Sequence, residues 1–319
     1  MATLASLLDL RVNRRRRLLW AISGIALLLS LFGMALSWRS PEIGLPLRPG
    51  LDFTGGTQIE LSRRCDDSCP PLTVSALEAG VRSISLPAEA GESPPDLRGV
   101  SGQILDDGEL VLLRLPTLSA AQGQALVDQI RPLVGEIEPG GLSVDTIGPT
   151  LGAQLLRSSL ISLLVSFVGI ALYITFRYDR IFALLALVCL GHDVLITCGV
   201  FAWLGLLAGV EVNSLFAVAL LTIAGYSVND TVVIFDRIRE KRAELKEQSL
   251  AEQADAAVSA TLTRSVYTSL TTLLPLIALI LFGGSTLFWF AVALSTGILV
   301  GAWSSIAVAP TLLPVLSRR

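Results

Sequence analysis

The stretch Thr222–Arg242, TIAGYSVNDTVVIFDRIREKR, decides how this chain is organised. It has the pattern of an apolar helix that carries Asn229 and Asp230 inside its hydrophobic part and ends in a dense run of charge. The apolar pattern over Val212–Phe235 is long enough to cross a bilayer, which takes about 20 residues at about 1.5 Å each. Asp230 then lies roughly 9 Å from the midplane, on the charged side.

A carboxyl group at that depth is costly, at about 2.5–3.5 kcal/mol on the insertion scale. Nothing about folding an apolar helix requires Asp230, so the residue needs a partner or a role. One interpretation is a hydrogen bond that ties two helices together. The other is transport or proton relay, which the sequence favours.

The composition indicates a polytopic membrane protein. The chain has 319 residues, of which 52% are hydrophobic, and its mean hydropathy is +0.66. It lacks a GxxxxGK[ST] phosphate loop and zinc-type Cys/His spacing, and its one histidine, His192, lies in an apolar run. ATPase and hydrolase chemistry therefore have no support. We expect no enzymatic activity, no metal or other cofactor, and no nucleic acid partner.

Five further apolar runs predict membrane helices: Leu18–Leu36, Leu155–Phe176, Ile181–Leu206, Val266–Phe282 and Leu287–Pro310. Lys and Arg alternate between the short loops, which predicts cytoplasmic termini. We expect three parts: a basic cytoplasmic N-terminus with the first helix over 1–37, an exported domain over 38–150, and a five-helix bundle over 151–319. The charged connection at about 236–261 is either a solvated helix or a docking surface for a cytoplasmic partner.

The exported domain shows the element order β-α-β-β-α-β, which predicts an α+β ferredoxin-like fold. Its strands are expected at 57–62, 100–105, 109–115 and 142–147, and its helices at 72–84 and 119–134, with Ser119 as N-cap. Cys65 and Cys69 lie four residues apart in this domain. They are either a local disulfide or two free thiols.

Three more ionisable groups lie within the apolar spans. Arg264 lies roughly 12 Å from the middle of its span, at a depth similar to that of Asp230. It either pairs with Asp230 or extends to the interface. His192 and Asp193 lie near the middle of their span and form either part of a proton path or a static tie between helices. Gly297 and Gly301 form a GxxxG pattern, which permits close helix approach.

Several motifs together resemble one family. They are GLDFTGG at 50–56, IGPTLG at 147–152, GHDVLITCGVF at 191–201, GYSVNDTVVIFDRIRE at 225–240, TRSVYTSLTTLL at 263–274 and FGG at 282–284. In this order they resemble the SecD/SecF family of bacterial protein-export membrane subunits, within the resistance-nodulation-division group of proton-driven transporters. The resemblance marks Asp52, Phe53, Gly55 and Gly56 as a structural motif of the exported domain.

The resemblance implies that proton-motive force drives late steps of preprotein translocation beside the SecYEG channel, after SecA. It implies protons as the coupling ion and a relay of Asp230 and Arg264, to which we add Asn229, Asp193 and His192. The chain would then be half of a pseudo-symmetric pair with a SecD-like subunit. Its membrane would be the cytoplasmic (inner) membrane, or the thylakoid membrane in a photosynthetic source. The alternatives are a purely structural subunit of the same complex and an autonomous small-molecule exporter.

Overall fold

The chain folds into two compact units. A computed structural model describes residues 11–65, 69, 71–88 and 94–317. The helical unit takes in the chain up to Pro49 and again from Ser159, and the α/β unit spans Gly50–Ser158. Each unit has its own hydrophobic core. The α/β unit defined by these contacts begins and ends later than the domain expected over 38–150, and residues 1–10 lie outside the described part.

Within the described residues, six helices are long and apolar enough to cross a membrane, which confirms the predicted number. They are α2 (Arg16–Arg39), α6 (Pro149–Arg177), α7 (Arg180–Ala208), α8 (Ser214–Glu244), α9 (Leu250–Phe282) and α10 (Gly284–Trp303). The last span continues through the π turn η4 (Ser304–Val308) into α11 (Ala309–Leu316). A 3-10 turn, η1 (Val12–Arg15), precedes α2.

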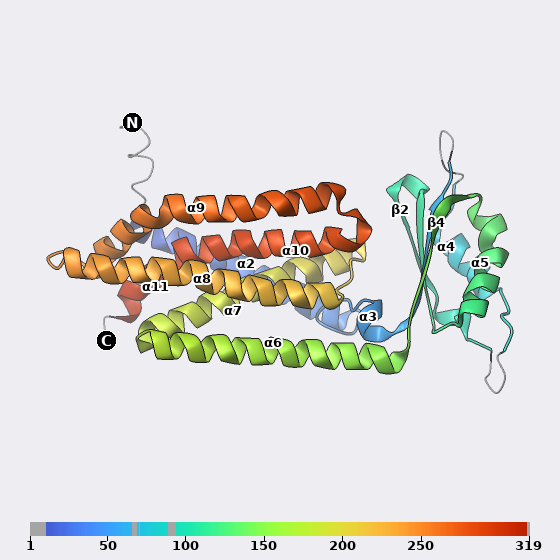
Figure 1. Cartoon of the computed structure of the whole chain (residues 1–319), viewed down its shortest axis with the longest axis horizontal. Helices are drawn as coiled ribbons and strands as arrows, with labels where there is room; N and C mark the ends of the chain where they lie inside the picture. Colours follow the sequence, from blue (N-terminus) through green and yellow to red (C-terminus); the bar gives the residue numbers. More distant parts are fainter. Residues whose placement is uncertain (1–10, 66–68, 70, 89–93, 318–319) are drawn as a thin grey trace. The chain divides into compact units, whose positions relative to one another are not determined.

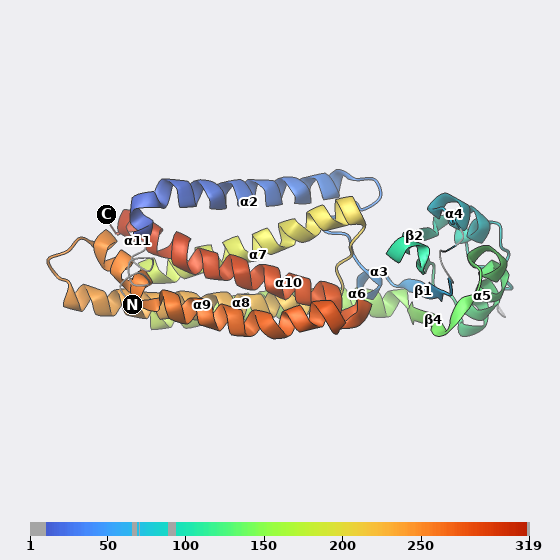
Figure 2. The ribbon, with the colours of Figure 1, turned by 90° about the horizontal axis from the view of Figure 1, so that it is seen from above.

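Helices α7, α8 and α10 form the centre of the helical unit, with α2 packed on α7 and α9 packed on both α8 and α10 (Figures 1 and 2). A Cβ atom on Gly297 would lie 2.3 Å from the Ile223 side chain, so α10 and α8 meet as closely as the GxxxG pattern predicts. Burial differs sharply around this centre. In its most apolar stretch α7 is 61% buried, whereas α6 is only 6% buried and α2 and α9 are 17% buried.

The charged connection expected over 236–261 consists of the end of α8, a short turn and the start of α9. Ser249 and Glu252 form a capping box at the start of α9. Asn13 of η1 donates a hydrogen bond of 2.8 Å to the Asp255 carboxylate, which ties the start of the described chain to α9.

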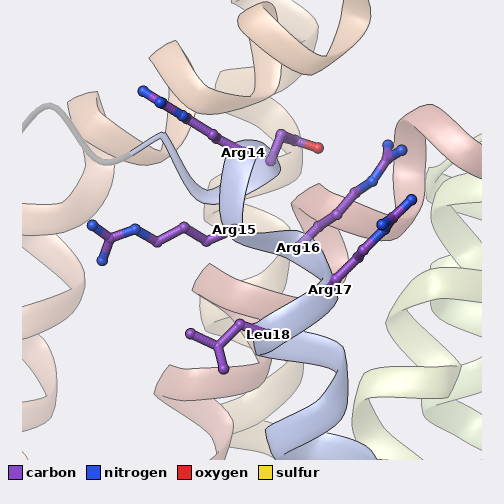
Figure 3. A pocket seen from close by; sticks show the side chains of 6 residues that line it. Arg14, Arg15, Arg16, Arg17 and Leu18 are labelled. Atoms are coloured by element: carbon purple, nitrogen blue, oxygen red, sulfur yellow. The ribbon is translucent and has the colours of Figure 1, made fainter.

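Arginines surround the first turn of α2. Arg14, Arg15, Arg16 and Arg17 line a pocket of about 500 Å³ together with Asn13 and Leu18. Figure 3 shows Arg14 and Arg15 extending to one side of the helix and Arg16 and Arg17 running side by side toward the other, so the four side chains do not converge on one point. The pocket is therefore a basic surface region at the N-terminal end of α2.

The α/β unit has the predicted ferredoxin-like fold. Its strands are β1 (Gly56–Arg63), β2 (Ser101–Leu105), β3 (Leu110–Leu115) and β4 (Ile137–Ile147), and its two longer helices are α4 (Val74–Arg82) and α5 (Ala120–Val134). The sheet order is β2-β3-β1-β4, and every pair is antiparallel. Both helices cover the same side of the sheet (Figure 1). Alternate side chains of β1 and β3 point into the core beneath them, because successive residues of a strand face opposite sides.

Two local predictions for this unit are resolved. Ser119 caps α5 through a capping box with Gln122. Cys65 and Cys69 form a disulfide, with Cα atoms 4.9 Å apart, so the structure selects the bridged alternative. Residues 66–68 between them lie outside the described part.

The GLDFTGG motif forms the entry to β1. Its first residues make the short helix α3 (Leu51–Thr54), and Gly55 and Gly56 follow with φ of 69° and 118°. A Cβ atom on Gly55 would lie 2.9 Å from Pro149 Cα, and one on Gly152 would lie 2.8 Å from the Gly55 nitrogen. The two glycine motifs, at 50–56 and 147–152, therefore pack backbone against backbone.

Candidate functional site

Asp230 lies inside the helical unit and is held by hydroxyl groups. Its side chain is buried in α8. Ser265 of α9 donates to Oδ1 over 2.9 Å, and Ser305 of η4 donates to Oδ2 over 2.5 Å. One carboxylate thus joins three helical elements. These hydrogen bonds offset much of the free-energy cost of burying the carboxylate among apolar side chains.

Asp193 is a second buried carboxylate, and its side chain in α7 is fully enclosed. Its neighbour His192 approaches it through Nδ1, 2.8 Å from Oδ1. Oδ2 accepts from Ser227 of α8 over 2.5 Å and from Ser304 of η4 over 2.8 Å. His192 and Asp193, the adjacent pair that the sequence indicates, are therefore hydrogen-bonded to each other. Asp193 is also bonded to α8 and η4.

The two carboxylates meet at consecutive serines. Ser304 reaches Asp193 and Ser305 reaches Asp230, and both serines begin the π turn η4. A wide turn of this kind inside a helix is uncommon and is often found at functional sites. Gly301 lies one turn earlier, where a Cβ atom would be 3.5 Å from Asp193 Oδ2, so the second glycine of the GxxxG pattern lies beside the site.

Arg264 does not lie against Asp230 in this structure. The arginine is exposed on α9, whereas the next residue, Ser265, is buried and bonded to Asp230. Adjacent residues on a helix point about 100° apart, so only one of the two can face α8. In the described part of the chain, no Lys or Arg makes an ion pair with either buried aspartate.

Of the remaining predicted site residues, Asn229 is exposed on α8 and His192 is buried. The Nε2 atom of His192 has no hydrogen-bond partner among the described residues. The structure therefore groups His192, Asp193 and Asp230, and leaves Asn229 and Arg264 on the outside of this chain.

Sequence reasoning missed the four serines Ser227, Ser265, Ser304 and Ser305. Small hydroxyl residues are common in membrane helices, so single serines give little signal. The adjacent pair at 304–305, following Gly301 in an otherwise apolar run, is the one pattern that marks a polar interior face.

The chemistry available at this site is proton transfer. Carboxylates held by hydroxyl groups, with an imidazole beside one of them, can each carry a proton or give it up. Among the described residues, no three His, Cys, Asp or Glu side chains gather as metal ligands would.

Two family models match the chain. The one described as "Protein export membrane protein SecD/SecF, C-terminal" matches residues 133–319, which include the whole of the carboxylate site. The one described as "SecD/SecF GG Motif" matches residues 43–66, which include Gly55 and Gly56. Those two glycines therefore lie within a segment that a family model describes by its GG motif.

Full-length relatives agree with this match. The chain is 54% identical over 302 residues to the protein translocase subunit SecF of Prochlorococcus marinus, covering 95% of this chain and 94% of the relative. It is 44% identical over 296 residues to the SecF subunit of a Synechocystis strain, covering 92% and 90%.

A crystal structure of SecDF from Thermus thermophilus, a translocon-associated membrane protein, matches with a TM-score of 0.76 and 31% identity. The match covers 94% of this chain and 38% of that longer chain. With its family models, its relatives and its fold in agreement, the chain belongs to the SecD/SecF family of protein-export membrane proteins.

Proposed function

We propose that this chain is a SecF-type subunit of a protein translocase and that it couples proton movement through the membrane to protein export. The observation that carries the proposal is Asp230, a buried carboxylate in an apolar bundle that is held by serine hydroxyls rather than by a fixed cation. A hydroxyl can serve both the charged and the neutral carboxyl, so this setting permits proton binding and release.

In this proposal Arg264 is not a fixed ion-pair partner of Asp230. Its side chain faces out of this chain, one residue from the serine that holds Asp230. A movement of α9 that turns Arg264 inward would bring a positive charge toward Asp230 and favour release of its proton. Moving one charge through 100 mV supplies about 2.3 kcal/mol, enough to bias such a two-state arrangement more than tenfold.

The proposed partner is a SecD-like subunit. The Thermus thermophilus relative is named SecDF, and this chain matches only 34% of its length. The sparsely buried helices α2, α6 and α9 offer apolar faces to such a partner or to lipid. The SecYEG channel, the emerging preprotein and, indirectly, SecA complete the proposed assembly. Protons are its coupling ion, and no step in it requires the chain to act as an enzyme.

The proposed location is the cytoplasmic membrane, or the thylakoid membrane in a photosynthetic source, with both termini in the cytoplasm. Within the helical unit, contacts bring the basic ends together: Asn13 bonds to Asp255, and Arg177 lies 3.9 Å from Asp236. The positive-inside bias assigns this end to the cytoplasm. The α/β unit would then be exported, where an oxidising environment suits the Cys65–Cys69 disulfide.

The test is Asp230→Asn, which keeps the size of the side chain and removes its titration. We expect export of a reporter preprotein to fall at least about tenfold, the scale of losing a coupling bias of more than 1.4 kcal/mol, while the protein still accumulates in the membrane. Asn229→Asp serves as the matched control, because it changes the exposed neighbour. Normal export by Asp230→Asn would refute proton coupling at this residue and favour a purely structural subunit.

A further inference from the structure

Each serine of the π turn has two acceptors within reach. Ser304 Oγ lies 2.8 Å from Asp193 Oδ2 and 3.1 Å from the Gly301 carbonyl oxygen. Ser305 Oγ lies 2.5 Å from Asp230 Oδ2 and 3.0 Å from the Ala302 carbonyl oxygen. A hydroxyl carries a single hydrogen, so each serine donates to one acceptor at a time and can accept through its oxygen.

This geometry provides two complete hydrogen-bond arrangements for each carboxyl. When the carboxylate is ionised, the serine hydrogen points to it. When the carboxyl is protonated, its own O–H donates to the serine oxygen, and the serine hydrogen turns to the backbone carbonyl. Neither arrangement leaves the carboxyl or the serine hydroxyl unpaired, and an unpaired buried group is the usual penalty for changing the charge of a buried acid.

We propose that Ser304 and Ser305 are positioning residues that reverse hydrogen-bond direction with the protonation of Asp193 and Asp230. The proposal rests on the proposed proton coupling and names residues that make it possible. Because the two serines share a peptide bond in one π turn, a change at one carboxyl is transmitted to the turn that holds the other. The Cys189 thiol, 3.8 Å from the Ser304 carbonyl oxygen, also contacts this turn.

The other titratable groups around the carboxylates are few. Helix α7 supplies His192 and Cys189, α8 supplies Tyr226, and α9 supplies Arg264. The described residues of α10, η4 and α11 supply none. Tyr226 donates to Ser269 rather than to a carboxylate. The reversal of hydrogen bonds at Ser304 and Ser305 therefore involves Asp193, with its neighbour His192, on one side and Asp230 on the other.

The test is infrared difference spectroscopy of the full chain in lipid vesicles across a pH series. The band of protonated carboxyl groups reports proton binding, and its loss in Asp230→Asn assigns the Asp230 component. We expect Ser305→Ala to move the pH midpoint of that component by about one unit, since a hydrogen bond to the charged form is the stronger one. We expect Ser305→Thr, which keeps the hydroxyl, to leave the midpoint within about 0.3 units.

Ser269→Ala is the control, because Ser269 is also buried on α9 and bonded, yet touches neither carboxylate. An unchanged midpoint in Ser305→Ala, or an equal shift in Ser269→Ala, would overturn the proposal. Should Ser305→Ala not fold, Ser304→Ala with Asp193→Asn as the assigning variant gives the same test at the other carboxyl. The measurement needs no export, so its failure is distinct from that of the proposed function.

Discussion

At the scale of single residues, the bundle accommodates a buried acid with hydroxyl groups instead of an ion pair. Asp230 bonds to Ser265 and Ser305, while Arg264 beside Ser265 faces outward. A permanent ion pair would hold the carboxylate in its charged form and make proton uptake costly, whereas neutral donors leave both protonation states open. In the proposed mechanism, the separation of Asp230 from Arg264 is thus part of what allows the carboxyl to bind and release a proton.

The charge-swapped variant Asp230→Arg with Arg264→Asp tests this separation. We expect no rescue, because the Asp230→Arg side chain would be buried among serines while the Arg264→Asp side chain would be exposed and unable to pair with it. Export of a reporter preprotein should stay as low as in Asp230→Arg alone, with immunoblots of the membrane fraction as the control for accumulation. Recovery to half of the parent level would show a static pair and contradict the structure.

The sequence located the carboxylates but not their partners. An acidic residue in an apolar run stands out because its burial is costly. Ser304 and Ser305 carry no such cost, and whether they face a carboxylate depends on the π turn, which no pattern in the sequence announces. In the same way, depth along a helix could be counted for Arg264, but its direction around the helix is set by packing.

At the scale of elements, the start of β1 depends on two glycine motifs that lie far apart in sequence. Gly55 has φ 69° and ψ 180°, a conformation that is essentially restricted to glycine. Its Cα also faces Pro149 at the start of α6, with Gly152 closing the contact from the other side. The motif pair therefore fixes how β1, β4 and the first turn of α6 meet within the α/β unit.

Gly55→Ala is expected to destabilise this junction by about 2 kcal/mol or more, because a Cβ atom would be both strained and pressed against the Pro149 backbone. Amide hydrogen exchange of β1 and β4 in the full chain should then quicken about 30-fold. Gly99→Ala is the control, since a Cβ atom there meets nothing within 4 Å and Gly99 is not among the glycines with positive φ. Equal effects in the two variants would mean that Gly55 has no special role.

Elements were predicted better than the contacts between them. The six apolar spans and the β-α-β-β-α-β order follow from periodicity, and the structure confirms both. Strand β4 nonetheless begins at Ile137, five residues before the predicted start at Leu142. Its early part contains Pro139, Gly140 and Gly141, which strand propensities disfavour, and these residues lie in a register shift between the pairs Leu61–Leu142 and Arg63–Ile137. Continuous pairing with β1 therefore starts at the predicted Leu142, and the one pair at Ile137 extends the strand beyond it.

At the scale of the whole molecule, charge and cysteine usage support the proposed orientation. Basic residues gather at one end of the helical unit, around Arg14–Arg17 and the end of α8. The disulfide Cys65–Cys69 lies in the α/β unit, and the free cysteines Cys189 and Cys198 are buried in α7. Only the Cys65–Cys69 pair can thus report on a side of the proposed topology, because Cys189 and Cys198 are enclosed within a membrane helix.

A membrane-impermeant maleimide applied to reduced bacterial spheroplasts that express the full chain tests this orientation. We expect Cys65 and Cys69 to be labelled without permeabilisation, because the α/β unit is proposed to lie outside, and only after the disulfide is reduced. Cys189 and Cys198 serve as internal controls that stay unlabelled, since both are buried in α7. Labelling of Cys65 and Cys69 only in permeabilised cells would place the α/β unit in the cytoplasm and reverse the assignment of both termini. It would also move Asp230 from the cytoplasmic to the exported side of the midplane, so this one measurement bears on the direction of coupling as well as on topology.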